Sequence, residues 1–363
     1  MAERKKSALL RDELYAKLSN HHRANAKAKI AKKKLKSVNG GYAVTAQEYA
    51  KVKEFWRPYG VTPQKYWYKL FWDGKDTHDP RYIPDDIWIG KMLPYFNNLM
   101  WGRAYADKCA YDRLFQNLNR PRTICKNSCG HYYDGDQNVI SKEEAMALCM
   151  KEERFIVKFA TFSYGGKDVQ VFDRGEVNEG SVKKLFEEYR MNFVIQALVE
   201  QHEDLSRLNA SSLNTIRTIS FFFKGEVHIL SSQLRIGSAG ARVDNYASGG
   251  IACDVRPDGR LNDHAISRKG LIDQHPNGFY FKDIVIPNYN KVIDVIKSEA
   301  SKLPHLNIIG WDFGIDRNGE PIFIELNISP GQNQRGGGPT FGDLTEDVLK
   351  DVFIDQTLKD AFR

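Results

Sequence analysis

Short runs in which apolar and polar residues alternate recur along the chain after about residue 106, and this period of two predicts β-strands. Between them lie segments with the longer period of helices. We expect strands at 154–162, 169–173, 193–199, 215–223 and 226–236, and helices at 180–190, 287–302 and 343–353. Helices set beside largely antiparallel strands predict an α+β fold for this part of the chain.

The segment 308–331, IIGWDFGIDRNGEPIFIELNISPG, predicts two further strands. The dipeptide Asn318–Gly319 predicts the turn between them, because these residues accept the positive φ values of tight turns. If the loop has two residues, Arg317 pairs with Glu320, and the same register places Asp312 opposite Glu325. Two facing carboxylates about 5 Å apart repel each other, and a bound cation removes the repulsion.

Asn327 lies on the same face of this hairpin, two residues after Glu325, and its partner Gly310 leaves space above it. Asp312, Glu325 and Asn327 are therefore candidate ligands for Mg²⁺ or Mn²⁺, hard cations that bind oxygen atoms and share their shell with phosphate. The alternative is a surface hairpin with solvated acids. The strands IIGW and IFI are too apolar for an exposed hairpin, which favours the metal site.

The bulk properties indicate a cytoplasmic globular enzyme. The chain has 363 residues, 42% hydrophobic and 27% charged, enough for two or three packed subdomains. No apolar run approaches the roughly 18 residues needed to span a bilayer, and the charged N-terminus lacks a signal-peptide core. The five cysteines contain no CxxC pair, so we expect free thiols rather than structural zinc.

Positive charge is concentrated at the N-terminus. Residues 1–40 contain twelve Lys or Arg and three Asp or Glu, whereas the whole chain carries a net +7. Residues 5–37 predict one helix, with Leu10, Leu14 and Leu18 on one stripe. Three hypotheses compete: a solvated helix packed loosely on the body, a basic helix on an anionic membrane at the inner face, or a nucleic-acid contact. No second basic patch appears, so we expect no nucleic-acid partner.

Aromatic residues are dense between positions 45 and 106, which predicts a small helical domain that packs its own core. A surface that binds carbohydrate or lipid is the alternative. We expect four parts: a basic extension at 1–40, the aromatic helical domain at 41–105, and two α+β subdomains at 106–200 and 201–363.

Several residues in the two α+β subdomains suit phosphate chemistry. Lys158 lies within an apolar strand, where a lysine needs an anionic partner. The turn SYGG that follows offers unobstructed backbone amides to phosphate oxygens. Arg217 and Arg235 lie on successive strands and come close if the register sum is near 449–452, around either a polyanion or nearby acids. Asp244 and Asn245 line a site or only build their own turn.

Other catalytic patterns are missing from the sequence, which has no GxSxG elbow and no HxxxH pair. What remains is a set of metal ligands, lysines, a glycine-rich turn and arginines, as phosphoryl transfer requires.

With these residues, the chain resembles the ATP-grasp superfamily and, within it, the sugar-transfer-associated ATP-grasp proteins linked to polysaccharide synthesis. The resemblance covers about residues 106–340. Asp312, Glu325 and Asn327 match the metal-binding pattern, and IELNISPG is similar to the LEVNTSPG of D-alanine–D-alanine ligases. It implies an ATP-grasp fold of two α+β subdomains that clasp ATP, with a helical N-terminal region.

The resemblance also implies roles in binding ATP. Lys108, in the pair Asp107–Lys108, and Lys158 would contact phosphates, and the loop Ser163–Gly166, with Ser163, Gly165 and Gly166, would close over them. The linker Gln196–Val199 would read adenine through backbone groups of Ala197 and Val199, and Glu203, with Glu200 as a rival, would bind the ribose. The subfamily signature implies substrate contacts for Asn214, Asp244 and Asn245 and catalytic roles for Arg217 and Arg235.

Many relatives have an arginine two residues before the metal-binding aspartate, where this chain has Gly310. We expect Arg235 to take over that role. The resemblance implies an ATP- and Mg²⁺-dependent carboxylate–amine ligase that works through an acylphosphate, releases ADP and phosphate, and modifies a cell-surface glycan precursor. A kinase for a sugar or polyol hydroxyl and a nucleotide-binding interaction protein are the alternatives.

Overall fold

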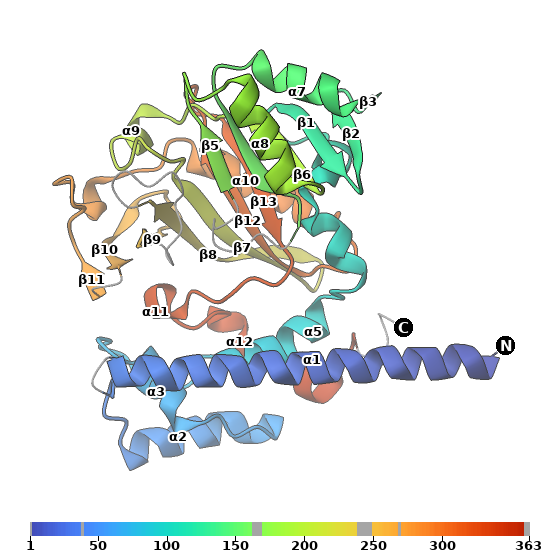
Figure 1. Cartoon of the computed structure of the whole chain (residues 1–363). Coiled ribbons are helices and arrows are strands. Elements are labelled where there is room, and N and C mark those ends of the chain that lie inside the picture. The colour runs from blue at the N-terminus through green and yellow to red at the C-terminus, as the bar shows by residue number, and fades with distance from the viewer. Residues whose placement is uncertain (1, 38–39, 162–168, 238–248, 268–269, 359–363) are drawn as a thin grey trace.

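Two antiparallel β-sheets dominate the computed structural model, which describes residues 2–37, 40–161, 169–237, 249–267 and 270–358 (Figure 1). The six-stranded sheet has the order β3-β2-β1-β6-β4-β5, and the seven-stranded sheet has the order β11-β10-β9-β8-β7-β12-β13. The first is built from residues before 200 and the second from residues after it. The α+β prediction is confirmed.

The strands of the six-stranded sheet are β1 (Thr123–Ser128), β2 (His131–Asp134), β3 (Val139–Ile140), β4 (Phe155–Phe159), β5 (Val169–Phe172) and β6 (Phe193–Ala197). Those of the seven-stranded sheet are β7 (Thr215–Phe223), β8 (Glu226–Ile236), β9 (Ile251–Val255), β10 (Leu261–Ser267), β11 (Gly270–Ile272), β12 (Ile308–Ile315) and β13 (Pro321–Asn327).

Helices precede, cover and follow the sheets. They are α1 (Ala2–Ser37), α2 (Ala46–Trp56), α3 (Lys65–Phe71), α4 (Asp85–Ile87), α5 (Leu93–Phe96), α6 (Tyr111–Leu114), α7 (Lys142–Met150), α8 (Glu179–Tyr189), α9 (Glu203–Ser206), α10 (Tyr289–Ala300), α11 (Gln334–Gly337) and α12 (Thr345–Lys350). Local sequence signals mark the first residues of several of these helices. Capping boxes start α2 at Thr45 with Glu48, and α7 at Ser141 with Glu144, by satisfying the first backbone amides.

The helical N-terminal region shares its core with the seven-stranded sheet. Its aromatic side chains are largely buried, as a core role requires, and they include Trp56, Tyr68, Trp72, Trp88 and Phe96. They do not, however, pack only on one another. The same cluster contains Phe221 and Phe223 of β7, Ile308 of β12 and Val348 of α12. The region is thus attached to the sheet rather than built around a core of its own.

Helix α1 crosses the lower part of the molecule, above α2 in the view of Figure 1, and its N-terminal part extends beyond the body. The predicted single helix is confirmed. Ala31 is buried and Leu35 packs on the helical region, whereas Leu14 and Leu18 are about 60% exposed, at 59% and 61%. Among the helices of the described residues, none is both long and apolar enough to cross a bilayer.

The β12–β13 hairpin has the expected pairing of Asp312 with Glu325 and of Gly310 with Asn327, but its turn is one residue longer than predicted. The amide of Asp316 bonds to the carbonyl of Glu320, and Gly319, with φ 79°, closes a three-residue loop. A bulge between Asp312 and Phe313 then shifts the register by one residue. The longer turn and the bulge cancel, so the two carboxylates still face each other.

Candidate active site

Five polar residues form one row across the seven-stranded sheet. The register aligns Glu325 of β13 with Asp312 of β12, Asp312 with Arg217 of β7, Arg217 with Gln233 of β8, and Gln233 with Asp254 of β9. Because side chains alternate between the two faces of a sheet, directly paired residues lie on the same face. We call this alignment the polar row. It places acids, an arginine and an amide side by side on one surface.

The centre of the polar row is an ion pair between Arg217 and Asp312. Nε and Nη2 of Arg217 both donate to the carboxylate of Asp312, and Nη2 lies 2.5 Å from Oδ2. Arg235 Nη1 lies 3.9 Å from the same oxygen. Burial acts to raise the pKa of Asp312, but the two arginine charges outweigh burial and lower the pKa to about 2. Of the two expectations for the arginines, the structure thus shows pairing with a nearby acid.

The second carboxylate of the row is paired with Lys108, whose Nζ lies 3.2 Å from Glu325 Oε2. Lys108 begins a short 3₁₀-helix, Lys108–Ala110, that Asp107 caps by accepting a hydrogen bond from the amide of Cys109. The amide of Lys108 donates to the carbonyl of Ala160, which directly follows β4 of the six-stranded sheet. Lys108 therefore joins the end of one sheet to the acidic end of the row on the other.

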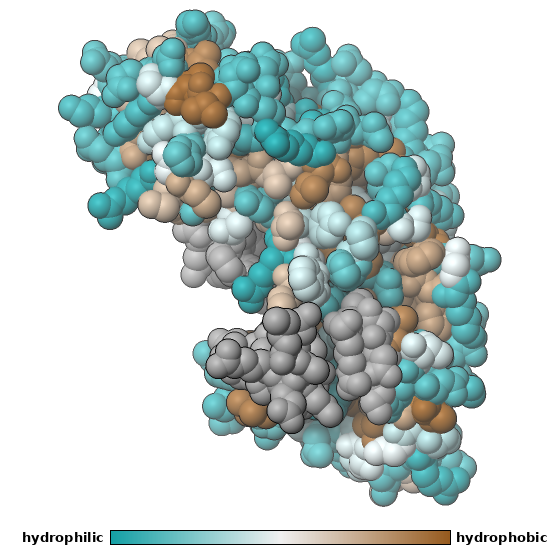
Figure 2. All heavy atoms as spheres, turned by 90° about the vertical axis from the view of Figure 1, so that its right-hand side faces the viewer, coloured by the Kyte–Doolittle hydropathy of each residue, from teal (hydrophilic) through white to brown (hydrophobic). Residues whose placement is uncertain are grey.

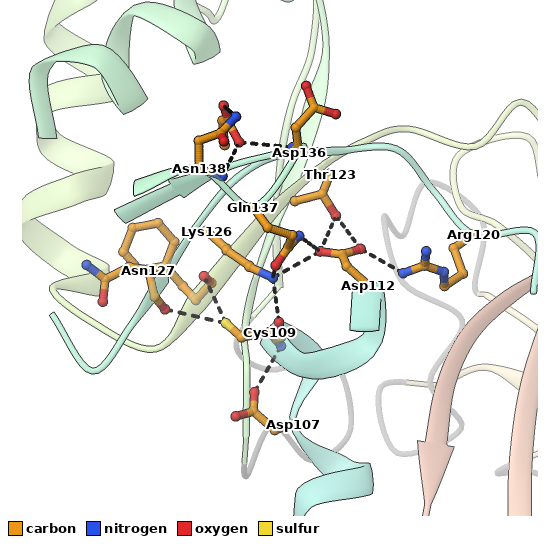
Figure 3. A network of polar contacts seen from close by, with 12 residues as sticks. Asp107, Cys109, Asp112, Arg120, Thr123, Lys126, Asn127, Asp136, Gln137 and Asn138 are labelled. Carbon is orange, nitrogen blue, oxygen red and sulfur yellow. Dashed lines mark hydrogen bonds and ion pairs between the residues drawn. The ribbon is translucent and has the colours of Figure 1, made fainter. Parts of the chain in front are cut away.

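A buried network holds the segment of Lys108 in place (Figure 3). Lys126 of β1 is only 3% exposed, and its Nζ donates to the carbonyl of Cys109 at 2.6 Å and to Asp112 Oδ2 at 3.1 Å. Asp112 also accepts from Arg120 at 2.7 Å, and Gln137 completes the ring of partners. Because a buried lysine needs an anion and hydrogen bonds, this network rigidly ties the chain after Lys108 to the sheet.

Asn327 and Gly310 lie at the end of the hairpin beside Asp312. The side-chain Nδ2 of Asn327 is buried without a hydrogen-bond partner, so this donor is not used to hold the fold. A Cβ at Gly310 would lie 3.0 Å from Pro330 and 3.3 Å from Asn327, so Pro330 fills the space that the sequence left open. The side chain of Arg217 passes 3.6 Å from that position. Arg217, rather than Arg235, is therefore the arginine beside Gly310.

The donor set fits a hard divalent cation. Asp312 and Glu325 supply carboxylate oxygens, and Asn327 adds the oxygen of a side-chain amide, as Mg²⁺ or Mn²⁺ prefers. Among the described residues, no group of three His, Cys, Asp or Glu side chains could hold a metal. The thiols of the described structure are free. Metal binding by Asp312, Glu325 and Asn327 stays a prediction.

Lys158 belongs to the other sheet. It is the fourth residue of β4, between Val194 of β6 and Val169 of β5, and is 9% exposed. Ser163, Gly165 and Gly166, which follow it, lie outside the described residues, as do Asp244 and Asn245. Figure 2 shows that the surface is hollowed between the upper part of the molecule, which carries the six-stranded sheet, and the lower helical part.

Comparison with known protein families shows to which family this chain belongs. Residues 96–335, about two thirds of its 363 residues, match the family described as sugar-transfer associated ATP-grasp. The chain belongs to this ATP-grasp family. A search of curated proteins found no match.

Solved structures with a similar arrangement share little sequence with this ATP-grasp protein. D-alanyl-alanine synthetase A from Vibrio cholerae is 11% identical, with 71% of this chain and 66% of that chain covered and a TM-score of 0.42. L-amino acid ligase from Bacillus licheniformis is 12% identical, with 69% and 48% covered and a TM-score of 0.40. The biotin carboxylase domain of 2-oxoglutarate carboxylase from Hydrogenobacter thermophilus is 13% identical, with 70% and 47% covered and a TM-score of 0.42. The chain thus spans between about half and two thirds of the length of these structures.

The linker assigned to the base of the nucleotide continues β6. Gln196 is paired on both sides, with Thr123 of β1 and Ile156 of β4. The amide of Ala197 donates to the carbonyl of Arg122 at 2.9 Å, so this donor is already used within the sheet. Val199 is half-buried just beyond the strand. These residues lie at one end of the six-stranded sheet, and their contact with a base stays a prediction.

Two glutamates were rivals for the ribose position. Glu200 is largely exposed and its Oε2 lies 2.9 Å from Arg317 Nη1, in the loop of the β12–β13 hairpin. Glu203 is exposed at the first position of α9, and no ion pair of its carboxylate occurs among the described residues. The ribose role stays a prediction for Glu203, with Glu200 as its rival.

Asn214, for which the resemblance implied a substrate contact, lies just before β7, and its Oδ1 is buried without a hydrogen-bond partner. Its contact with a substrate stays a prediction. Asn214 is completely buried, and its Nδ2 donates to Gln201 Oε1 at 2.9 Å and to the carbonyl of Leu205 at 2.8 Å. Its backbone amide donates to the same Gln201. A side chain enclosed in this way fixes the turn before β7, and so it positions Arg217 three residues later.

Sequence reasoning missed two members of the polar row. Gln233 Nε2 donates to Asp254 Oδ1 at 2.8 Å, and Asn333 Nδ2 donates to the same oxygen at 2.5 Å. A signal was present for Gln233, because it lies two residues before Arg235 and therefore on the same face of β8. Asp254 carried no such signal, since the pairing of β9 with β8 cannot be deduced from the period alone.

Proposed function

We propose that this protein is an ATP- and Mg²⁺-dependent carboxylate–amine ligase that works through an acylphosphate. The observation that carries the proposal is the joining of Asp312 and Glu325 with Arg217, Arg235 and Lys108 at one place. Lys158 adds a fourth cation on the facing sheet. Four positive and two negative side chains leave an excess of two positive charges, which complements the charge of about −2 of an ATP–Mg²⁺ complex.

In the proposed reaction, a carboxylate oxygen of the first substrate attacks the γ-phosphorus of ATP, and the bond from that phosphorus to the ADP oxygen breaks. An amine then attacks the acyl carbon, the bond to phosphate breaks, and the amine proton passes to solvent. Lys108 and Lys158 neutralise the charge that develops on the phosphates, and Arg217 with Arg235 stabilises the acylphosphate. The cation held by Asp312, Glu325 and Asn327 supplies Lewis-acid stabilisation of the phosphoryl oxygens.

Arg217 would pair with two groups in this scheme, first Asp312 and then the substrate. In the structure it neutralises Asp312, which would otherwise be a buried, uncompensated carboxylate. A divalent cation held by Asp312 would take over that charge, and the Arg217 guanidinium would then be available to an anionic group of the substrate. The role first given to Arg235 therefore passes mainly to Arg217, with Arg235 as the second cation of the same site.

The acceptor is a glycan precursor in this proposal, in keeping with the description of the family as sugar-transfer associated. The proposed role is in the cytoplasm, in the assembly of surface polysaccharide. A kinase that phosphorylates a sugar or polyol hydroxyl would use the same phosphate-binding residues, and a nucleotide-binding interaction protein would use them without turnover.

Replacing Glu325 with Gln tests the ligase proposal. It keeps the size of the side chain but removes one anionic metal ligand, and we expect acceptor-dependent ADP formation to fall at least about hundredfold. Glu320→Gln, in the exposed turn of the same hairpin, is the matched control and should keep wild-type turnover. Near-wild-type turnover of the Glu325 variant would contradict the assignment. Free phosphate as a product supports a ligase, and phosphate retained on the acceptor supports the kinase.

We also propose that the outer part of α1 contacts an anionic membrane surface. Leu14, Leu18 and Ile30 are 59–61% exposed, and Lys29 and Lys33, which neighbour Ile30 on the same helix, are exposed as well. Exposed apolar residues among lysines are typical of helices that lie at a lipid interface. The full chain should sediment with vesicles that contain anionic phosphatidylserine, and Leu14→Glu with Leu18→Glu should abolish this. Equal sedimentation of both proteins would refute the membrane contact.

A further inference from the structure

The loop that follows Asn327 is held from below by the helical N-terminal region. Asn97 Nδ2 donates to the carbonyl of Ile328 at 2.9 Å, and Trp88 Nε1 donates to the carbonyl of Pro330 at 2.9 Å. Between them, Arg23 of α1 donates to Ser329 Oγ at 2.6 Å. The basic helix therefore reaches a residue that lies two positions from a proposed metal ligand.

The same loop returns to the polar row a few residues later. The side chain of Asn333 bonds to both Gln233 and Asp254, which form the end of the row. Gly336 packs so closely on Asp254 that a Cβ there would lie 1.8 Å from a carboxylate oxygen. The segment 328–336 therefore runs along the polar row, fixed at one end beside Asn327 and at the other beside Asp254.

Three cations lie near Asp85, which is bonded to Gln332 of this segment. Lys27 and Lys34 lie on the inner, half-buried face of α1, and Arg335 lies in α11. Asp85 of α4 is the acid near Lys27 and Lys34, and it accepts a hydrogen bond from Gln332 Nε2 at 3.0 Å. Within the described part of the chain, none of the three cations makes a direct ion pair. We call Lys27, Lys34 and Arg335 the cation cluster.

The cluster is costly to keep without an anion. Burial lowers the pKa of Lys34, and the nearby charge of Arg335 lowers it further. Half-buried like charges on two different elements repel each other, and one carboxylate leaves at least two of them uncompensated. Lysines on the opposite, exposed face of α1, such as Lys29 and Lys33, would avoid this cost. The inward placement of Lys27 and Lys34 indicates a function for their charge at this position.

We propose that the cation cluster binds a phosphate group of the acceptor substrate and so holds the acceptor along the segment 328–336, next to the polar row. This inference rests on the proposed function, since it names the substrate class of that site. A phosphate dianion would satisfy two to three cations with charge-assisted hydrogen bonds. Glycan precursors that carry a phosphate ester or diphosphate have this group, and free phosphate is the other source of the same chemistry.

The test measures phosphate binding by calorimetry in protein saturated with ADP and Mg²⁺, which occupy the nucleotide site. The probes are glucose 1-phosphate and inorganic phosphate. We expect saturable binding, tighter for the ester if the cluster serves an acceptor. Lys27→Ala with Lys34→Ala should weaken both probes at least about tenfold. The control, Lys29→Ala with Lys33→Ala, removes the same charge from the same helix and should bind like the wild type.

Equal affinity of the two double variants, or no saturable binding of either probe to the wild type, would overturn the proposal. Arg335→Gln gives an independent check if the helix variant does not fold, because it lies outside α1 and should weaken binding to a similar degree. The phosphate titration is repeated without ADP. The protein could bind phosphate through Lys27 and Lys34 and yet fail to bind ADP. That result would support the phosphate site at the cation cluster and refute the proposed ligase function.

Discussion

The two faces of the seven-stranded sheet are equally buried near β12 but differ in what compensates the burial. On one face, Trp311 and Phe313 are 0% and 1% exposed and pack in the apolar cluster that contains residues of α10. On the other, Asp312 is 4% exposed and is surrounded by arginines. Burial alone therefore does not distinguish core from site. The distinction lies in whether a buried group is compensated by packing or by charges that a ligand can also use.

The largest effect is expected on the charged face. Arg217→Met leaves Asp312 buried without its main partner, and we expect the free energy of unfolding to fall by about 3–5 kcal/mol. Urea denaturation measures the loss. If the row is a site rather than core, the double variant Arg217→Met with Asp312→Leu should recover most of the stability and none of the ADP-forming activity. Recovery of activity as well would show that the ion pair is only structural.

A smaller loss is expected on the apolar face. Trp311 Nε1 donates to Ser220 Oγ at 2.8 Å, and Ser220 is completely buried. Trp311→Phe keeps most of the packing but leaves that hydroxyl without its donor, which costs about 1–3 kcal/mol. Turnover, measured under conditions where the variant is folded, should change by less than about threefold. A large fall in turnover with unchanged stability would contradict the assignment of this face to the core and of the other face to the site.

The smallest effect concerns the pH dependence of stability at the far end of the polar row. Burial raises the pKa of Asp254 above its ordinary 3.8, although Asn333 and Gln233 donate hydrogen bonds to it. An acid with a raised pKa in the folded state stabilises the fold fully below pH 3.8, and this contribution is lost as pH rises through the folded-state pKa. Asp254→Asn should remove this downward slope in urea midpoints recorded from pH 4 to 7. Asp263→Asn, at an exposed position of β10, should leave the slope in place.

Much of the fold and the centre of the site follow from local sequence patterns. The period of two identified β7, β8, β12 and β13, and parity within the strands placed Asp312, Glu325 and Asn327 on one face. The facing of Asp312 and Glu325 was deduced from a two-residue turn that the structure does not contain. It was nevertheless correct because the bulge offsets the longer loop, and neither feature can be recognised from the Asn–Gly dipeptide alone.

The remaining features depend on contacts between distant parts of the chain. Lys126 occurs in the run TICKNS, where nothing in the sequence indicates that it holds Asp112 and the segment of Lys108 (Figure 3). The aromatic region was expected to have its own core, and its sharing of one with β7 reflects packing that composition cannot specify. The inward face of α1 could not be predicted from the sequence for another reason. Its lysines are so numerous that the sequence shows no preferred face.

The central claim is that the polar row and the facing lysines bind a nucleotide with its cation. Calorimetric titration with ATP, in the presence and absence of Mg²⁺, tests it most directly. We expect one saturable site that Mg²⁺ tightens, at least tenfold weaker in Lys158→Met and unchanged in Lys151→Met, which alters an exposed lysine of the same sheet region. No saturable binding of ATP to the wild type, or equal affinities of the two lysine variants, would contradict the account.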